Sequence, residues 1–509
     1  MTTQKNHPAA GQPDSFDRYP GYYGSDLELT YTPQRSVFTL WAPTADKVRL
    51  NLYASGEGGE PEERLEMRPS DDGTWRVAAE RDLRGTFYTF QIEKEGKWLD
   101  ETPGIWAKAV GVNGDRAAVI DLRETDPEGW EADRAPELKM YSDIILYELH
   151  HRDFSVAPDS GIENKGKFLA LTETGTKTPQ GEASGLDHLK ELGVTHIHIL
   201  PSFDYATVDE ARLNDKTYNW GYDPKNYNVP EGSYSTDPAD PAARIREFKQ
   251  MVQSLHRNGM RIVLDVVYNH TSRDSLLAKT HPEFFYHDQE GKPRCRFWQD
   301  VYDLDYTNQG LCDYMVETAL SWARRGVDGY RCDVAPMVPL SFWTRARAAM
   351  DEVNPDFIWL AETHHYPFLT RMRDQGWQLH ADAEMYECFD VTYDYDVHYF
   401  YEDYLKGKGS LKAYVDAINR QKAMYPQNYV KLRLLENHDQ VRVASLVHTR
   451  EQLFQWTAFS FFEKGLTMLY AGQEYAVAKR TNVTKAEPFA REQCPGCLLY
   501  TSPSPRDPK

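Results

Sequence analysis

Acidic side chains stand at the ends of strand-like runs in the second half of this sequence. Asp333 and Glu362 each close such a run, and Asp439 follows a third run by a few positions. A fourth run contains or is followed by polar residues that fit the same pattern: Asp265, Asn269 and His270. Carboxyl groups gathered in this way are the groups that nucleophilic and acid–base chemistry requires.

Three converging acids suit the hydrolysis of a glycosidic bond. One carboxylate attacks the anomeric carbon and a carboxylic acid protonates the leaving oxygen, while a third acid can bind sugar hydroxyls. Arg331 lies two positions before Asp333, on the same face of a strand, and can keep that carboxyl ionised. A single acid is more often a salt-bridge partner or a helix cap, whereas three at successive strand ends favour a site.

Metal-dependent hydrolysis is the competing enzymatic interpretation. Five residues have side chains that bind metal ions: Asp265, His270, Asp333, Glu362 and His438. The sequence contains no HExxH motif and no tight cluster of histidines and acids, so this interpretation has the weaker support.

Eight strand-like runs alternate with amphipathic helical patterns from about residue 141 onward. One helical pattern spans 242–257 and another spans 342–353. This alternation predicts an α/β fold, a (β/α)8 TIM barrel, and a doubly wound sheet is the structural alternative. The predicted strands are 143–149, 194–200, 261–269, 327–333, 357–362, 381–385, 429–435 and 466–470.

The first 125 residues have a different pattern, with short β runs separated by turns, for example at 36–41, 47–53, 74–79 and 86–92. Several short strands at regular spacing indicate a β-sandwich that precedes the barrel. The predicted organisation is a disordered lead (1–15), a sandwich (16–125), a linker (126–140), a barrel (141–480) with an insertion (271–309), and a tail (481–509).

Composition restricts the possible partners. The chain has 509 residues, with 78 Asp and Glu against 58 Lys and Arg, so its net charge of −20 argues against nucleic acid as a partner. A mean hydropathy of −0.68 and the lack of a long apolar run argue against a membrane-spanning protein. No secretory signal is visible at the N-terminus, which predicts a cytoplasmic location. Oligomeric state is not predicted.

Four segments together resemble the α-amylase superfamily, glycoside hydrolase family 13. They are 265–270 (DVVYNH), 328–333 (DGYRCD), 361–364 (AETH) and 436–440 (ENHDQ). The resemblance implies a retaining mechanism on an α-glucan substrate. It implies Asp333 as nucleophile, Glu362 as acid/base and Asp439 as transition-state stabiliser. Around the −1 sugar it implies Asp265, His270, Arg331 and His438.

Within the family, the seven residues 218–224 (YNWGYDP) are similar to a signature of type I pullulanases. The resemblance implies that Tyr222 stacks under the −1 sugar and that the enzyme cleaves α-1,6 bonds. Residues 38–53 resemble the family's N-terminal carbohydrate module, which implies either glycan binding or a structural cap.

The segments after His270 depart from the pullulanase pattern. Residues 332–336 (CDVAP), 361–364 and 435–440 are more similar to α-1,4-acting amylases. One explanation is a chimera with a pullulanase-like front and an amylase-like back, and the other is a subfamily with mixed motifs. Two further alternatives stay open: α-1,4-glucan hydrolysis by an α-amylase-type enzyme, and a non-catalytic glucan-binding protein or misfolded chimeric fragment.

The sequence also gives expectations for the C-terminal tail and for bound metal ions. Residues 497–507 resemble a translated sequencing adapter, so Cys494 and Cys497 are not interpreted as a redox or zinc motif. The barrel is expected to stop after its eighth strand, which predicts poor folding of the chain.

No cofactor is required by the predicted chemistry. Calcium is possible at Asn269, where some relatives bind it, although the spacing lacks a dense set of oxygen ligands.

Overall fold

The computed structural model describes residues 22, 24–214, 217–288, 290–294, 298 and 300–479. These residues form two compact units, one of residues up to 111 together with 115–121, and one of 112–114 together with the chain from 122 onward. The predicted lead and tail lie outside the described residues. No helix in the described part is long and apolar enough to cross a membrane.

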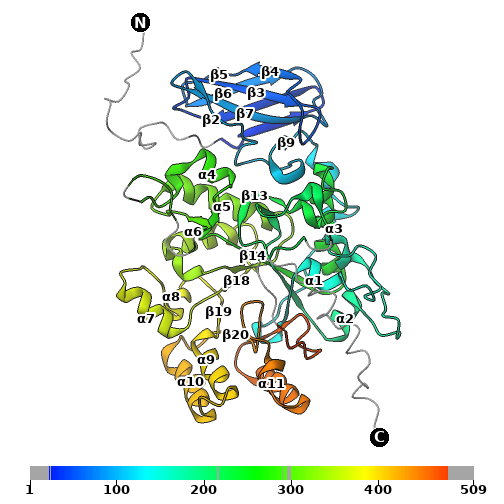
Figure 1. The fold of residues 1–509 in the computed structure, drawn as a ribbon, viewed down its shortest axis with the longest axis vertical. Helices are drawn as coiled ribbons and strands as arrows, with labels where there is room; N and C mark the ends of the chain where they lie inside the picture. Colours follow the sequence, from blue (N-terminus) through cyan, green and yellow to red (C-terminus); the bar gives the residue numbers. More distant parts are fainter. Residues whose placement is uncertain are drawn as a thin grey trace. The chain divides into compact units, whose positions relative to one another are not determined.

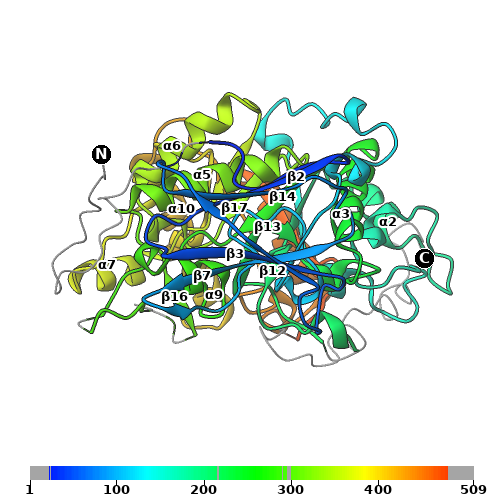
Figure 2. The ribbon, with the colours of Figure 1, turned by 90° about the horizontal axis from the view of Figure 1, so that it is seen from above.

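The first unit is a β-sandwich. One sheet has the order β1-β2-β6-β5, and the other has the order β4-β3-β7-β8 with β9 paired to β7. Figure 2 shows β3 and β7 side by side, where they pair antiparallel along seven residues of each strand. The strands are β1 (Glu28–Thr32), β2 (Arg35–Trp41), β3 (Lys47–Tyr53), β4 (Glu63–Glu66), β5 (Arg68–Pro69), β6 (Thr74–Ala79), β7 (Phe87–Lys94), β8 (Lys97–Trp98) and β9 (Ala117–Ala118).

Alternation of side chains explains the sandwich. On β3, Val48 and Leu50 are completely buried, as are Phe90 on the neighbouring strand β7 and Phe38 on β2 of the other sheet. Because side chains alternate along a strand, these apolar residues share the inner faces of the two sheets. The expected β runs at 36–41, 47–53, 74–79 and 86–92 are therefore confirmed as β2, β3, β6 and β7.

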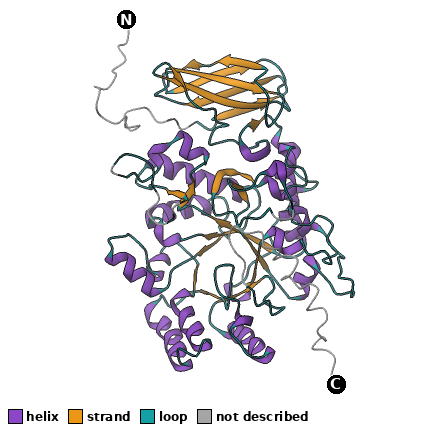
Figure 3. Cartoon of the chain, in the orientation of Figure 1, coloured by secondary structure: helices purple, strands orange, loops and turns teal. Residues whose placement is uncertain are grey.

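The second unit contains a closed barrel of eight parallel strands, as predicted. Its order follows the chain, and β10 and β21 pair to close it. In Figure 1 the labelled barrel strands lie in the middle of this unit, and Figure 3 shows all the α-helices in it. The strands are β10 (Ile145–Leu149), β11 (His196–Ile199), β14 (Arg261–Val266), β17 (Gly329–Cys332), β18 (Ile358–Ala361), β19 (Val391–Tyr393), β20 (Lys431–Arg433) and β21 (Leu466–Tyr470).

The sixth strand differs from the prediction. Residues 381–385 were expected to form it, but the strand is β19, and α8 (Asp382–Met385) occupies the predicted position. Ala, Glu and Met favour helix, whereas the Val-Thr-Tyr sequence of β19 is β-branched and aromatic. Tertiary pairing with β18 and β20 selects the second segment.

Helices surround the barrel strands. The pattern at 242–257 is confirmed as α3, which begins where Asp240 caps Ala242 N at 2.9 Å and Pro241 occupies the first turn. Its apolar face, including Phe248 and Met251, is fully buried. The helices are α1 (His151–Ser155), α2 (Gly185–Glu191), α3 (Pro241–Arg257), α4 (Leu276–Thr280), α5 (Gln309–Ala323), α6 (Leu340–Asp351), α7 (Tyr366–Asp374), α8, α9 (Tyr395–Leu405), α10 (Leu411–Met424) and α11 (Arg450–Phe462).

Two small sheets lie outside the barrel wall. The hairpin of β12 (Phe203–Tyr205) and β13 (Pro224–Pro230) brackets the loop that contains Tyr222. β15 (His270–Ser272) pairs with β16 (Val301–Asp303) across the predicted insertion.

Candidate active site

Arg331 is the centre of the candidate site. It lies on β17, is completely buried, and contacts three carboxyl groups. Its Nη1 is 2.8 Å from Asp333 Oδ1 and 3.0 Å from Asp265 Oδ1, and its Nη2 is 2.8 Å from Glu362 Oε1. One guanidinium therefore holds the predicted nucleophile and the predicted acid/base next to each other at the carboxyl ends of β17 and β18.

The pKa values of these two carboxyl groups differ, because burial and neighbouring charges affect each group to a different extent. Burial raises the pKa of Asp333 to about 6, against the opposing charge of Arg331. Burial also raises the pKa of Glu362, to about 8, and the charges of Asp333 and Asp439 add to the increase. Near neutral pH Asp333 is the ionised group and Glu362 the protonated one, which is the division of roles that a nucleophile and an acid need.

The backbone after Asp333 is in an unusual conformation. Val334 has φ +39° and ψ +39°, the left-handed region that a β-branched residue rarely adopts. This conformation directs its N–H to Glu362 Oε2 at 2.9 Å. The strained turn thus links the two carboxyl groups a second time, through the backbone.

Five side chains form a closed ring of polar contacts that includes Asp265, one of the three carboxyl groups next to Arg331. Glu148 Oε1 accepts from His438 Nδ1 at 3.0 Å, and His438 Nε2 lies 2.8 Å from the Tyr222 hydroxyl. That hydroxyl donates to Asp265 Oδ2 at 2.7 Å. His198 closes the ring, with one nitrogen 3.2 Å from Glu148 and the other 3.4 Å from Asp265.

The ring requires a doubly protonated His438. Nδ1 faces a carboxylate and must donate, and Nε2 must also donate because the Tyr222 hydrogen is already directed to Asp265. Burial opposes this charge, but Asp439 and Glu148 outweigh it and raise the pKa of His438 to about 9. The pKa of His198 is also raised, because Asp265 and Glu148 outweigh its burial.

The remaining predicted site residues lie around this ring. Asp439 Oδ2 is 3.4 Å from His438 Nε2, and its side chain is 42% exposed, so it faces the open side of the site. His270 Nε2 is 3.0 Å from the backbone oxygen of Tyr222 and therefore holds the loop of that residue in place. Tyr222 itself stacks on His438 with the two rings 14° from parallel.

Asn269, the residue predicted to bind calcium, lies beside His270. Its described side-chain contact is Nδ2 to His270 Nδ1 at 3.4 Å. Among the described residues, the only group of three or more acidic, His or Cys ligands that could hold a metal ion is Asp204, Glu210 and Glu231. There Arg244 contacts Glu210 at 2.7 Å, so a cation of the chain itself already occupies the acidic group. The predicted calcium at Asn269 gains no support from this donor set.

Two ring residues, Glu148 and His198, were not identified from the sequence. Both are completely buried and lie within barrel strands, Glu148 in the largely apolar β10 (ILYEL) and His198 in β11 (HIHI). A charged residue within an apolar strand is a signal, because an unpaired buried charge is very costly. The sequence could not reveal the partner, since Glu148 and His438 are 290 positions apart.

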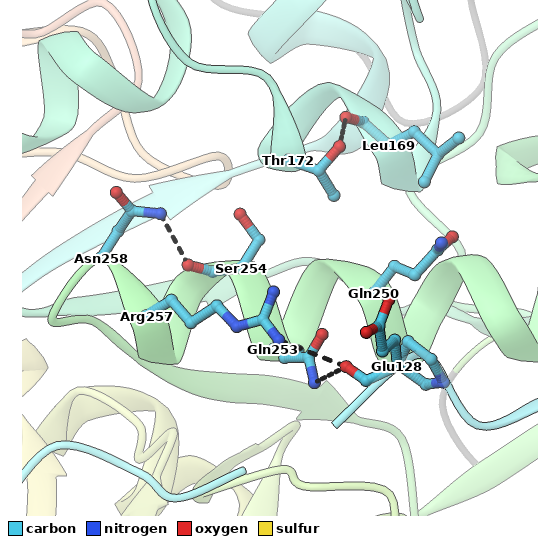
Figure 4. Close-up of a pocket in the computed structure, with 9 residues that line it drawn as sticks. Glu128, Leu169, Thr172, Gln250, Gln253, Ser254, Arg257 and Asn258 are labelled. Carbon is cyan, nitrogen blue, oxygen red and sulfur yellow. Dashed lines mark hydrogen bonds between the residues drawn. The ribbon is translucent and has the colours of Figure 1, made fainter. Parts of the chain in front are cut away.

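A pocket of about 530 Å³ on the outer face of α3 is not part of this site. Figure 4 shows that Gln253 and Arg257 both point to the backbone oxygen of Glu128, at 3.2 and 3.3 Å. Two of the polar side chains of this pocket are thus already bonded to the segment 127–128.

Comparison with known sequences agrees with the geometry. The α-amylase catalytic domain matches residues 166–293 and 294–496, and carbohydrate-binding module 48, the isoamylase N-terminal domain, matches residues 26–105. The chain is 36% identical over 348 residues to a pullulanase of Bacillus subtilis, which is 67% of this chain and 47% of that one. It is 31% identical over 408 residues to pullulanase A of Streptococcus pneumoniae, which is 72% of this chain and 30% of that one. The chain thus spans half or less of the length of these two relatives.

Solved structures extend the similarity over nearly the whole chain. A mutant pullulanase from Paenibacillus barengoltzii complexed with maltotriose matches with a TM-score of 0.83 and 32% identity, over 95% of this chain and 80% of that one. The match continues on both sides of residue 270, where the motifs change from pullulanase-like to amylase-like. Together with the barrel and its buried carboxyl groups, these matches establish that the chain belongs to the α-amylase family of glycoside hydrolases, family 13.

Proposed function

We propose that this protein hydrolyses α-1,6 branch bonds in α-glucans by a retaining mechanism. The observation that supports it most is the contact of Arg331 with both Asp333 and Glu362, since a retaining enzyme needs a nucleophile and an acid close together. The similarity to pullulanases along 67 to 95% of the chain favours the α-1,6 bond. Relatives complexed with maltotriose and with maltohexaose support a glucan as the ligand.

The reaction follows from the protonation states. Ionised Asp333 attacks the anomeric carbon while protonated Glu362 donates its hydrogen to the leaving oxygen, which gives a covalent glycosyl-enzyme. Glu362, now a carboxylate, takes a proton from water, and the water oxygen attacks the anomeric carbon and releases Asp333. Arg331 stabilises the charges of both carboxylates during these steps.

Products from pullulan test the bond preference. We expect maltotriose to accumulate, because cleavage of each α-1,6 bond of pullulan releases that unit. Panose-type products would instead support α-1,4 cleavage, the function suggested by the motifs after His270. Asp333→Asn is the control and should release no reducing sugar. If neither the parent nor this variant released sugar while the parent still bound glucan, the chain would be a non-catalytic binding protein.

We infer that no metal ion takes part in the chemical steps, because Asp333 and Glu362 supply both the nucleophile and the proton. Dialysis against EDTA should leave the hydrolysis rate unchanged. A rate that fell on dialysis and recovered with added calcium would contradict this inference, and loss of that recovery in Asn269→Ala would place the ion at Asn269.

A further inference from the structure

The Asp439 carboxylate lies on a loop whose backbone must fix its direction. This loop follows β20, and the Asp439 side chain is 42% exposed. Its contact with His438 Nε2, at 3.4 Å, is longer than a charge-assisted hydrogen bond usually is. That contact by itself therefore holds the carboxylate only weakly, and the conformation of the loop decides where the carboxylate points.

Asn437 holds the backbone of this loop. Its Oδ1 accepts hydrogen bonds from the backbone N–H groups of Asp439, at 3.1 Å, and Gln440, at 3.0 Å. An asparagine side chain that bonds to the backbone two residues further on closes a tight turn. The Asn437 side chain is completely buried, so water does not compete for these two hydrogen bonds.

The two backbone contacts also determine how the Asn437 amide is oriented. A backbone N–H can only donate, so the atom of the amide that faces Asp439 and Gln440 must be the oxygen. The NH₂ group therefore points the other way, where Nδ2 donates to the hydroxyl oxygen of Tyr395 at 2.7 Å. Tyr395 is the first residue of α9 and is buried, so it provides a fixed acceptor for the amide.

Tyr395 is itself close to the candidate active site. Its ring centroid is 5.1 Å from that of Tyr393, whose hydroxyl accepts from Arg331 Nε at 3.3 Å. Burial raises the pKa of the Tyr395 hydroxyl, and the charges of Glu362 and Asp439 add to the increase. The acceptor of the Asn437 amide thus belongs to the same segment that contacts Arg331.

We propose that Asn437 and Tyr395 are positioning residues that direct the Asp439 carboxylate toward the bound sugar. Tyr395 fixes the Asn437 amide, and the amide fixes the backbone on which Asp439 lies. Neither residue needs to touch the sugar. The inference rests on the proposed function, because it assumes a glucan next to Asp439.

Hydrogen exchange of the full chain tests the turn without a ligand. Asn437→Leu removes the amide and should speed exchange at the backbone N–H groups of 439 and 440 by about tenfold. Tyr395→Phe should speed it less. Asn437→Asp keeps an oxygen toward both N–H groups and should keep the parent's exchange rates. Tyr404→Phe, which removes a hydroxyl from another tyrosine of α9, is the control and should change nothing.

Calorimetric titration with maltotriose tests the positioning role. All proteins carry Asp333→Asn, so that no sugar is cleaved. Asn437→Leu should weaken binding by about tenfold, and the double variant with Tyr395→Phe should bind like Asn437→Leu alone, since both act through one contact. Asn437→Asp should restore most of the affinity. When Asp439→Ala is also present, Asn437→Leu should weaken binding no further, a result that a purely structural role would not give.

Three results would overturn the proposal. They are unchanged exchange at 439 and 440 in a folded Asn437→Leu variant, additive losses of affinity in the double variant, and an equal loss of affinity from Asn437→Leu with and without Asp439→Ala. If Asn437→Leu did not fold, unchanged exchange and affinity in Tyr395→Phe would overturn it equally. A parent chain that bound maltotriose but released no sugar from pullulan would contradict the proposed function alone, because exchange and titration do not depend on hydrolysis.

Discussion

Arg331 contacts three charged groups, more than any other described residue of the site. Its guanidinium contacts Asp265, Asp333 and Glu362, and all of its side chain is buried. A buried carboxyl group next to one cation and two like charges has a pKa that depends on every neighbour. The pH dependence of hydrolysis is therefore a direct test of this arrangement.

We expect a bell-shaped dependence of kcat/KM on pH. Asp333 must be ionised to attack, so the rate should rise as pH increases through about 6. Glu362 must be protonated to donate, so the rate should fall as pH increases through about 8. Initial rates on pullulan from pH 4 to pH 10 at constant ionic strength would measure both limbs. A rate that is independent of pH between 7 and 10 would show that Glu362 is not the acid.

Glu148 is expected to maintain the charge of His438. In Glu148→Gln the negative partner is lost, burial then has more effect, and the pKa of His438 should fall below its present value of about 9. Near pH 8 the His438 imidazole of the variant should be neutral, so that roughly one charge-assisted hydrogen bond is lost. This loss should lower kcat by about tenfold. Near pH 6 the imidazole is charged in both proteins and the difference should be smaller.

Two measurements check the Glu148 prediction. NMR titration of the His438 side chain should show the lower pKa directly. Glu191→Gln removes an exposed carboxylate of α2 and should change neither the titration nor kcat. An unchanged His438 titration in Glu148→Gln would contradict the role assigned to Glu148.

At the scale of elements, the loop between β12 and β13 depends on one glycine. Gly221 has φ +92°, and an added Cβ would lie 3.0 Å from the backbone oxygen of Pro201 and 3.1 Å from Tyr205. Gly221→Ala should therefore cost about 1–3 kcal/mol of stability through strain and crowding. It should also lower kcat, because the substitution displaces the neighbouring Tyr222.

Gly193→Ala is the matched control for the loop. Gly193 has φ +76°, but no atom lies within 4 Å of an added Cβ, and it is remote in sequence from the Tyr222 loop. This variant should show the backbone strain alone, with a lower melting temperature and an unchanged kcat. Equal effects of the two alanine substitutions on kcat would refute the positioning role of the loop.

The barrel strands illustrate what local patterns can predict. Seven of the eight strands lie within the runs identified from the sequence, because apolar strands that alternate with helices have a distinctive period. The sixth was misplaced because α8 and β19 are both short, although their residue propensities agree with the structures that they form. For such short elements, pairing with neighbouring strands determines the outcome.

At the scale of the whole molecule, the two units have separate hydrophobic cores. Phe90 is completely buried in the sandwich, and Met468 is completely buried in the barrel. Replacing either with alanine should cost about 2–5 kcal/mol. We expect Phe90→Ala to lower the thermal transition of the sandwich and Met468→Ala to lower that of the barrel, as measured by scanning calorimetry.

The control for this experiment is Met424→Ala. Met424 is 55% exposed on α10, so its substitution should leave both transitions unchanged. A single transition that moves equally with Phe90→Ala and Met468→Ala would show that the two units unfold as one, contrary to the expectation.

The sequence by itself determined the barrel and the sandwich and predicted three candidate acids, because strand and helix periods are local properties and the acids follow strand ends. Tertiary structure alone decided which charges meet. Glu148 and His198 meet because β10 and β11 pair side by side, and closure of the barrel brings His438, 290 positions further along the chain, next to Glu148. The protonation states that divide the roles of Asp333 and Glu362 also depend on burial and neighbouring charge, which no local pattern contains.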